Sequence, residues 1–262
     1  MEYKFIKYTL ENSVAVITFN RPEVLNSFNI PMAKEVQDAL TKCEEKNTIR
    51  AVVITGEGRA FSAGQDLAEA APKDEPLADL GKFLEKSYNP IIKQIYEIEK
   101  PVVAGVNGVA AGAGANIALA CDIVVASEKA SFVQAFSKIG LIPDSGGTYF
   151  LPRLIGLQKA SALMMLGDKL TADEAEKMGM IYKVYKEDEF EANLKTLSSK
   201  LAEMPTRGLA LTKKALHQSM NNNLYRQLNI EKEFQIEAGK TNDYKEGVAA
   251  FLEKRKPNFT GN

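Results

Sequence analysis

Histidine and cysteine are scarce in this chain of 262 residues, and tryptophan is absent. The one histidine, His217, lies on the polar side of a helical pattern, where we expect a solvated surface residue. A Ser-His-Asp triad, a Cys-His pair or a multi-histidine metal site would have to be built on that residue alone. Cys43 and Cys121 form no Cys-x-x-Cys motif, so we expect neither a disulfide framework nor a metal site. Catalysis would then depend on carboxylates and backbone dipoles.

Long apolar runs and an excess of one charge are also missing. No segment approaches the roughly 20 apolar residues that would span a bilayer, and the first residues lack the apolar block of a signal peptide. The 33 basic and 34 acidic side chains leave a formal net charge of -1. Such a balance gives no field that would collect nucleic acid or an anionic membrane. We therefore expect a cytoplasmic protein without nucleic-acid or membrane partners.

Short apolar segments alternate with helical patterns through the first two thirds of the chain. Residues 3–19 alternate like a hairpin that turns at Glu11-Asn12, and residues 50–56, 101–108 and 121–127 are continuous apolar strands. Helical patterns lie between these strands, which is typical of an α/β protein with a buried sheet.

The organisation changes after about residue 186, where strand patterns end and helical segments follow one another. We therefore expect an α/β core over residues 1–186 and a helical segment over residues 187–262. Within the core, residues 68–79 combine two prolines with several charges, and we expect a mobile surface loop there.

Two glycine-bearing turns follow two of the predicted strands, at residues 61–67 (FSAGQDL) and 106–116 (VNGVAAGAGAN). Small residues allow another molecule to approach the backbone, and a helix N-terminus leaves N–H groups unpaired. Two such groups aimed at one oxygen would form an oxyanion hole. The alternative is that the small residues only permit tight strand–helix packing. A dinucleotide-binding motif is disfavoured, because Ile117 stands where its third glycine would fall.

A third motif, at residues 135–156, places Asp144 before Ser145 and two glycines at the start of a helix predicted from about Thr148. Asp144 could cap that helix or form an Asx turn. It could instead present its carboxylate to a pocket. Ser145 lacks the G-x-S-x-G context of a nucleophile and has no histidine nearby in the sequence, so we do not expect it to be one.

The motifs together resemble the crotonase (enoyl-CoA hydratase/isomerase) superfamily, over the whole length of the chain and in the same order. Within that superfamily they are most similar to isomerases that act on a ring epoxide of phenylacetyl-CoA. The resemblance implies a spiral of strand–strand–helix turns for residues 1–186, and a helical segment for residues 187–262 that assembles homotrimers or dimers of trimers. The segments that carry it are NRPEVLNSF, GRAFSAGQDL, KPVVAGVNGVAAGAGAN, LACDIVVAS, FSKIGLIPDSGGT and EGVAAFLEKRKPNFTG.

The same resemblance implies a site for an acyl-CoA thioester. The backbone N–H groups of Gln65 and Ala113 would bind the thioester oxygen. Phe251 and Lys254 would reach the coenzyme A of a neighbouring subunit, although Lys254 could equally be a solvated helix end. The remaining coenzyme A contacts would fall on the backbone around Val24, Ser62, Ala63 and Gly64.

The chain departs from the hydratase pattern at two pocket-lining positions. Asn116 and Phe136 stand where the resemblance puts the two glutamates of enoyl-CoA hydratases, and neither side chain can exchange a proton near neutral pH. For Asn116 a capping or buried-amide role stays open, and Phe136 would in either case pack in the core. Asp144 remains as the expected acid/base.

One carboxylate suffices for isomerisation. The resemblance then implies conversion of ring-1,2-epoxyphenylacetyl-CoA to its oxepin, or of a 3-enoyl-CoA to a 2-enoyl-CoA, with no cofactor or metal beyond the coenzyme A of the substrate. The alternatives are a general enoyl-CoA hydratase and an RNA-binding member of the superfamily. The balanced charge argues against RNA binding.

Overall fold

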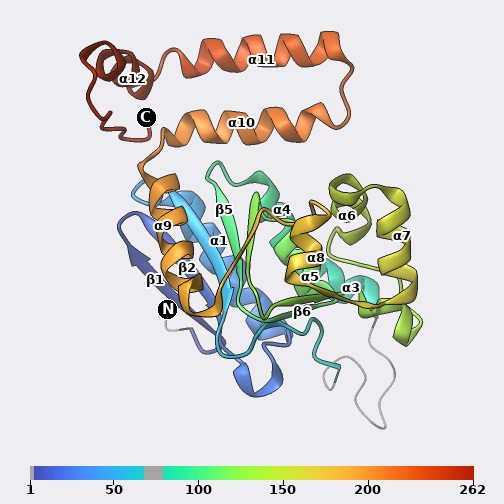
Figure 1. Cartoon of the computed structure of the whole chain (residues 1–262). Coiled ribbons are helices and arrows are strands. Elements are labelled where there is room, and N and C mark those ends of the chain that lie inside the picture. Colours follow the sequence, from blue (N-terminus) through green and yellow to red (C-terminus); the bar gives the residue numbers. More distant parts are fainter. Residues whose placement is uncertain (1–2, 68–78) are drawn as a thin grey trace.

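The computed structural model describes residues 3–67 and 79–262, so the predicted loop at 68–79 lies outside the described residues except for its last position. Two β-sheets form the centre of the molecule, helices cover them, and a helical hairpin stands beyond them (Figure 1). This arrangement confirms the predicted α/β class. In the two described stretches no helix combines the length and apolar character that a membrane span requires.

The larger sheet has the strand order β1-β2-β3-β5-β7-β10. β1 and β2 form an antiparallel hairpin, and the other neighbours run parallel. The hairpin turns at Asn12 and Ser13, both with positive φ, one residue later than predicted. The strands are β1 (Ile6–Glu11), β2 (Val14–Phe19), β3 (Ala51–Gly56), β5 (Val102–Val106), β7 (Ile123–Ser127) and β10 (Lys183–Tyr185).

The smaller sheet has the order β4-β6-β8-β9 and is built from three-residue strands. The chain runs from β3 to β4, from β5 to β6 and from β7 to β8, so each turn of the spiral gives one strand to each sheet. This repeat is the strand–strand–helix spiral that the resemblance implied. The strands are β4 (Ala60–Ser62), β6 (Val109–Ala111), β8 (Ser131–Val133) and β9 (Lys169–Thr171).

Helices cover both faces of the larger sheet, because its central strands are apolar on both sides. On β3, Val52 and Ile54 belong to a buried cluster with α1 and α4, whereas Val53 packs against α9. The helices are α1 (Ile30–Glu45), α3 (Leu80–Lys86), α4 (Tyr88–Glu97), α5 (Ala113–Leu119), α6 (Gly147–Ile155), α7 (Leu157–Leu166), α8 (Ala172–Lys177), α9 (Phe190–Glu203), α10 (Thr206–Ser219), α11 (Leu224–Ala238) and α12 (Asn242–Glu253), with short 3-10 turns at Pro22–Val24, Ala135–Ile139 and Glu187–Glu189.

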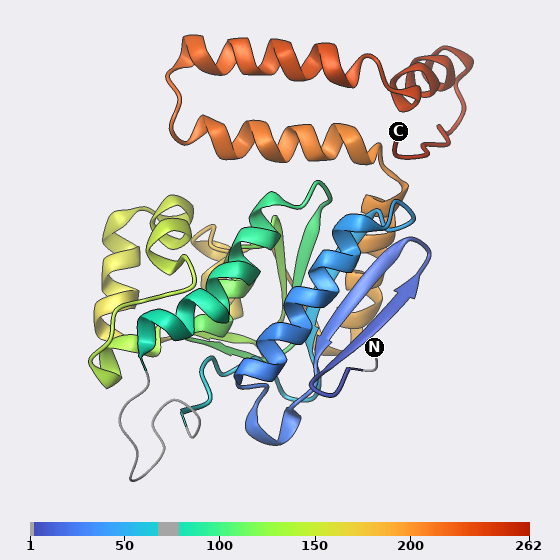
Figure 2. The same cartoon turned by 180° about the vertical axis from the view of Figure 1, so that it is seen from behind.

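The last strand ends at Tyr185, close to the expected division at residue 186. The next helix nevertheless belongs with the sheet: Leu194 of α9 lies so close to β5 that a Cβ added at Gly105 would be 2.4 Å from its side chain. The helices that stand away from the sheets begin only at Thr206, where α10 and α11 form an antiparallel pair with α12 at its end (Figures 1 and 2).

α10 is fixed to the core by an ion pair whose lysine is buried. Lys213 Nζ lies 2.9 Å from a carboxylate oxygen of Asp122 and donates to the carbonyl of Ile95 at 2.7 Å. One turn further on, His217 stacks on Tyr96 with ring centroids 3.8 Å apart. The expectation of a solvated histidine was therefore wrong, because the polar side of α10 faces the core at this point. Burial, together with the charge of Lys213, lowers the pKa of His217 to about 4.

The chain end folds back onto the start of α12. Asp243 is buried and accepts hydrogen bonds from the backbone N–H groups of Thr260, at 2.7 Å, and Gly261, at 2.8 Å. Arg50, just before β3, donates to Thr206 Oγ1 at 2.9 Å and to the carbonyl of Phe259 at 2.7 Å. One guanidinium group thus joins the sheet, the start of α10 and the last residues of the chain.

Candidate active site

The two glycine-bearing turns lie against each other, because β4 and β6 are parallel neighbours and both turns leave the same edge of the smaller sheet. A Cβ added at Gly64, where φ is +87°, would lie 2.8 Å from the carbonyl oxygen of Ala111 and 3.3 Å from the backbone nitrogen of Ala113. A Cβ at Gly114 would lie 2.5 Å from the carbonyl oxygen of Ser62. The small residues do permit tight packing, and that packing is what brings the turns together.

The backbone N–H groups of Gln65 and Ala113 are both available to a ligand. Phe28 donates to the carbonyl of Gly64 and accepts from the N–H of Asp66, so Gln65 between them turns its own N–H away from Phe28. Ala113 is the first residue of α5, whose N–H has no partner within the helix. Within residues 3–67 and 79–262, neither N–H donates to a protein acceptor.

The residues expected at coenzyme A lie next to these turns. The backbone N–H of Ala63 donates to the carbonyl of Leu25 at 2.9 Å, which holds the loop containing Val24 beside residues 62–64. Val24 is exposed, whereas Ser62 is fully buried, and among the described residues its hydroxyl bonds to backbone groups of Asn26 and Gly64. The side chain of Ser62 therefore holds the turn in place, and a contact of this residue with coenzyme A would have to come from its backbone.

Phe251 and Lys254 are far from the turns within one chain. Phe251 lies on α12 and Lys254 directly follows it, at the top of both views, whereas β6 lies below the helical hairpin (Figures 1 and 2). The Phe251 side chain is 83% exposed. A contact with coenzyme A would therefore require a second copy of the chain, as the resemblance implied.

Asp144 presents a half-buried carboxylate in the turn before α6. Its Oδ1 accepts a hydrogen bond from Ser145 Oγ at 2.8 Å. Burial raises the pKa of Asp144 to about 6, against the opposing effect of that hydrogen bond. No Lys or Arg in the described stretches forms an ion pair with it. The N-cap of α6 is Gly146, without a side-chain cap, so the alternative of a capping aspartate was wrong.

Asn116 is a fully buried amide whose hydrogen bonds are internal. Its Nδ2 donates to the backbone carbonyl of Asp144, and its Oδ1 accepts from Nε2 of Gln134, both at 2.8 Å. Gln134 was missed in the sequence, since nothing marks this glutamine except its place just before Phe136. Phe136 is buried as expected, and its ring lies 3.8 Å from the position of a Cβ added at Gly112, beside Ala113.

A family model with the description enoyl-CoA hydratase/isomerase matches residues 9–262. The chain belongs to this family.

Individual members are similar over their full length. The chain is 46% identical to the "1,2-epoxyphenylacetyl-CoA isomerase" of Escherichia coli K12, covering 98% of this chain and 99% of the relative. It is 44% identical to a "Probable enoyl-CoA hydratase" of Rhodobacter capsulatus, covering 100% of both. A crystal structure of an enoyl-CoA hydratase from Bacillus anthracis superposes with a TM-score of 0.91 at 31% identity, covering 99% of this chain and 100% of that one.

A second carboxylate of this hydratase/isomerase family member lies beside the first turn but has a cationic partner. Asp66, next to Gln65, forms an ion pair with Arg21 at 2.9 Å. In the described part of the chain, no three His, Cys, Asp or Glu side chains gather as they would around a metal ion. Asp144 differs from Asp66 in this respect. Its pKa is raised, and it has no cationic partner in the described stretches.

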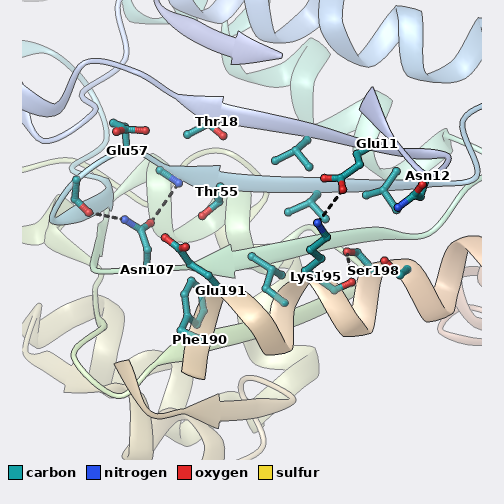
Figure 3. Close-up of a pocket in the computed structure, with 17 residues that line it drawn as sticks. Glu11, Asn12, Thr18, Thr55, Glu57, Asn107, Phe190, Glu191, Lys195 and Ser198 are labelled. Carbon is teal, nitrogen blue, oxygen red and sulfur yellow. Dashed lines mark hydrogen bonds and ion pairs between the residues drawn. The ribbon is translucent and has the colours of Figure 1, made fainter. Parts of the chain in front are cut away.

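A separate hollow of about 360 Å³ lies on the larger sheet beside α9 (Figure 3). The ion pair between Lys195 and Glu11, at 2.7 Å, crosses it. Asn107 at its other end donates to the carbonyl of Gly58 at 2.8 Å and accepts from the N–H of Gly56 at 3.2 Å. These polar groups satisfy one another, and the hollow contains none of the predicted site residues.

Proposed function

We propose that this family member is an acyl-CoA isomerase in which Asp144 is the acid/base. The thioester oxygen of the substrate would accept hydrogen bonds from the backbone N–H groups of Gln65 and Ala113. Both donors lack an internal acceptor in the described stretches. They would stabilise the negative charge that develops on this oxygen when a proton leaves the neighbouring carbon.

The observation that carries the proposal is the state of the Asp144 carboxyl group. Burial raises its pKa to about 6, and its hydrogen-bond donor is a neutral hydroxyl. A carboxylate with a pKa near the working pH is suited to accept a proton and return it. One such group is enough for isomerisation, because the proton removed at one carbon is delivered to another and no water is consumed.

Hydration is disfavoured by the surroundings of Asp144. Adding water across a double bond needs a group that activates the water and a group that protonates the α-carbon. Asn116 engages both ends of its amide in internal hydrogen bonds, and Phe136 has no proton to give. We therefore expect slow hydration of crotonyl-CoA.

Two isomerisations use the same parts, namely ring-1,2-epoxyphenylacetyl-CoA to its oxepin and 3-enoyl-CoA to 2-enoyl-CoA. We propose the ring epoxide as the principal substrate, on the support of the relative from Escherichia coli that is named for it. Coenzyme A would lie along Val24 and residues 62–64, and Phe251 and Lys254 of a neighbouring subunit would complete its site.

The test compares three substrates side by side: the ring epoxide, a 3-enoyl-CoA and crotonyl-CoA. Asp144→Asn keeps the size of the side chain but removes the carboxylate, so we expect isomerase turnover to fall roughly a hundredfold while thioester binding is retained. Asp173→Asn, an exposed carboxylate on α8, is the matched control and should leave turnover unchanged.

Each alternative has its own outcome in this experiment. Fast hydration of crotonyl-CoA by the wild type would replace isomerisation with hydration as the function. A folded Asp144→Asn variant with near-normal isomerase turnover would remove Asp144 from the mechanism. The melting temperature and the affinity for a CoA thioester, measured on the same samples, separate a loss of chemistry from a loss of folding or binding.

A further inference from the structure

We infer that Gln134 is a positioning residue for the Asp144 carboxylate and acts through Asn116. The inference rests on the proposed function, since it gives Gln134 a role only if Asp144 performs the proton transfer. The three residues come from separate parts of the chain: Gln134 follows β8, Asn116 lies in α5, and Asp144 precedes α6.

The hydrogen bonds between these residues have a fixed direction. Asn116 must present its NH₂ group to the carbonyl of Asp144, because that carbonyl can only accept. Its oxygen therefore points to Gln134, and Gln134 must present its own NH₂ group. The orientation of the Asn116 amide thus sets that of the Gln134 amide. An apolar side chain at residue 134 would leave the Asn116 oxygen without this donor.

The turn that carries Asp144 depends on such support. Ser145 and Gly146 both have left-handed backbones, with φ of +51° and +73°, a conformation that costs energy at a non-glycine residue. Asn116 also packs against Gly147 so closely that a Cβ there would lie 2.4 Å from its Nδ2. The place of the carboxylate is therefore set by where the Asn116 amide sits.

Burial of the polar Gln134 side chain is unfavourable in itself. Its side chain is 5% exposed, and its Oε1 has no hydrogen-bond partner in the described part of the chain. A buried acceptor without a partner is destabilising, because it loses its hydrogen bond to water and gains none in the protein. Among the described residues, the Gln134 side chain forms one hydrogen bond, the one that it donates to Asn116, and we infer that holding Asn116 is its role.

The experiment uses Gln134→Met, which keeps the length of the side chain and removes the donor. We expect kcat on the preferred isomerisation substrate to fall about tenfold with KM changed less than about twofold, because a displaced acid/base slows chemistry more than binding. Gln94→Met is the matched control. Gln94 also donates through Nε2, to Gln37 and Thr41, and also has an unpartnered Oε1, but it joins α4 to α1 away from Asp144.

A double-mutant cycle distinguishes positioning from general destabilisation. If Gln134 acts through Asp144, then Gln134→Met should lower kcat in the wild type but not in the Asp144→Asn background. An equal further fall in that background would overturn the inference. An unchanged kcat in Gln134→Met would also overturn the inference. If Asp144→Asn is slow in the same experiment, the proposed function is retained. A fully active Asp144→Asn variant would instead overturn the proposed function.

Gln134→Glu gives an independent readout if the methionine variant does not fold. A neutral buried carboxyl group can donate to the Asn116 oxygen, whereas an ionised one cannot. We therefore expect kcat of this variant, relative to the wild type, to decrease as the pH rises from about 6 to about 9, as the added carboxyl group loses its proton. A ratio that is independent of pH would contradict the assigned direction of the hydrogen bond.

Discussion

The burial of Asp144 predicts how the rate of catalysis depends on pH. Because its pKa is raised to about 6, it is largely ionised at neutral pH and able to accept a proton. We expect kcat/KM to be level near pH 8 and to fall about tenfold per unit below pH 6. A pH–rate profile checks this, and a level rate down to about pH 5 would show that ionisation of Asp144 is not required.

Ionisation of Asp144 should increase activity as the pH rises, but it should lower the free energy of unfolding. The pKa of Asp144 is higher in the folded state than in the unfolded state. Its protonation therefore stabilises the folded state, fully at pH values below the unfolded pKa, and this contribution is lost as the pH rises through about 6.

Removing the hydroxyl donor in Ser145→Ala should raise the pKa of Asp144 further, so the acid limb of the pH–rate profile should move to higher pH. Ser145→Gly should move the limb in the same way while relieving the left-handed backbone.

At the scale of elements, the docking of α10 depends on Lys213, one turn before His217 on the side of the helix that we expected to be solvated. Lys213→Ala would remove the cation from the Asp122 carboxylate, whose side chain is 18% exposed, and we expect a loss of about 3 kcal/mol in the free energy of unfolding. Lys214→Ala is the control, since the partly exposed pair of Lys214 with Glu99 should contribute about 0–1 kcal/mol. Urea unfolding of both variants measures the difference, and equal losses would contradict the assigned role of Lys213.

The elements that the sequence predicted are those with a long, uniform pattern. The strands at residues 50–56, 101–108 and 121–127 are buried on both faces, and such strands are continuously apolar. The strands of the smaller sheet were not predicted, because three residues are too few to show an alternation.

The site divides in the same way. Gln65, Ala113 and Asp144 could be predicted because each lies in a contiguous motif that carries the resemblance. The contacts of Asn116 with Gln134 and with Asp144 span 18 and 28 positions, and His217 stacks on a tyrosine of another helix. Such contacts depend on how helices and turns pack in three dimensions, which no local pattern records.

At the scale of the whole molecule, the helical segment exposes more apolar surface than a monomer would be expected to leave in water. We expect self-association into trimers or pairs of trimers, with these side chains covered. Light scattering at micromolar concentration checks this, and a single species of about the 28.8 kDa chain mass would contradict it. The exposed side chains include Leu224, Tyr225, Leu228, Ile236, Phe251 and Leu252.

The folded-back chain end makes the C-terminus an unsuitable place to shorten or nick this protein. Loss of the last residues would deprive Asp243 of its two backbone donors and Arg50 of one acceptor. Asp243 would then be a buried carboxylate without these partners, at the start of the helix that ends just before Lys254. Limited digestion by a carboxypeptidase should therefore loosen α12 well before it reaches that helix, and a protein trimmed by only a few residues would already be altered.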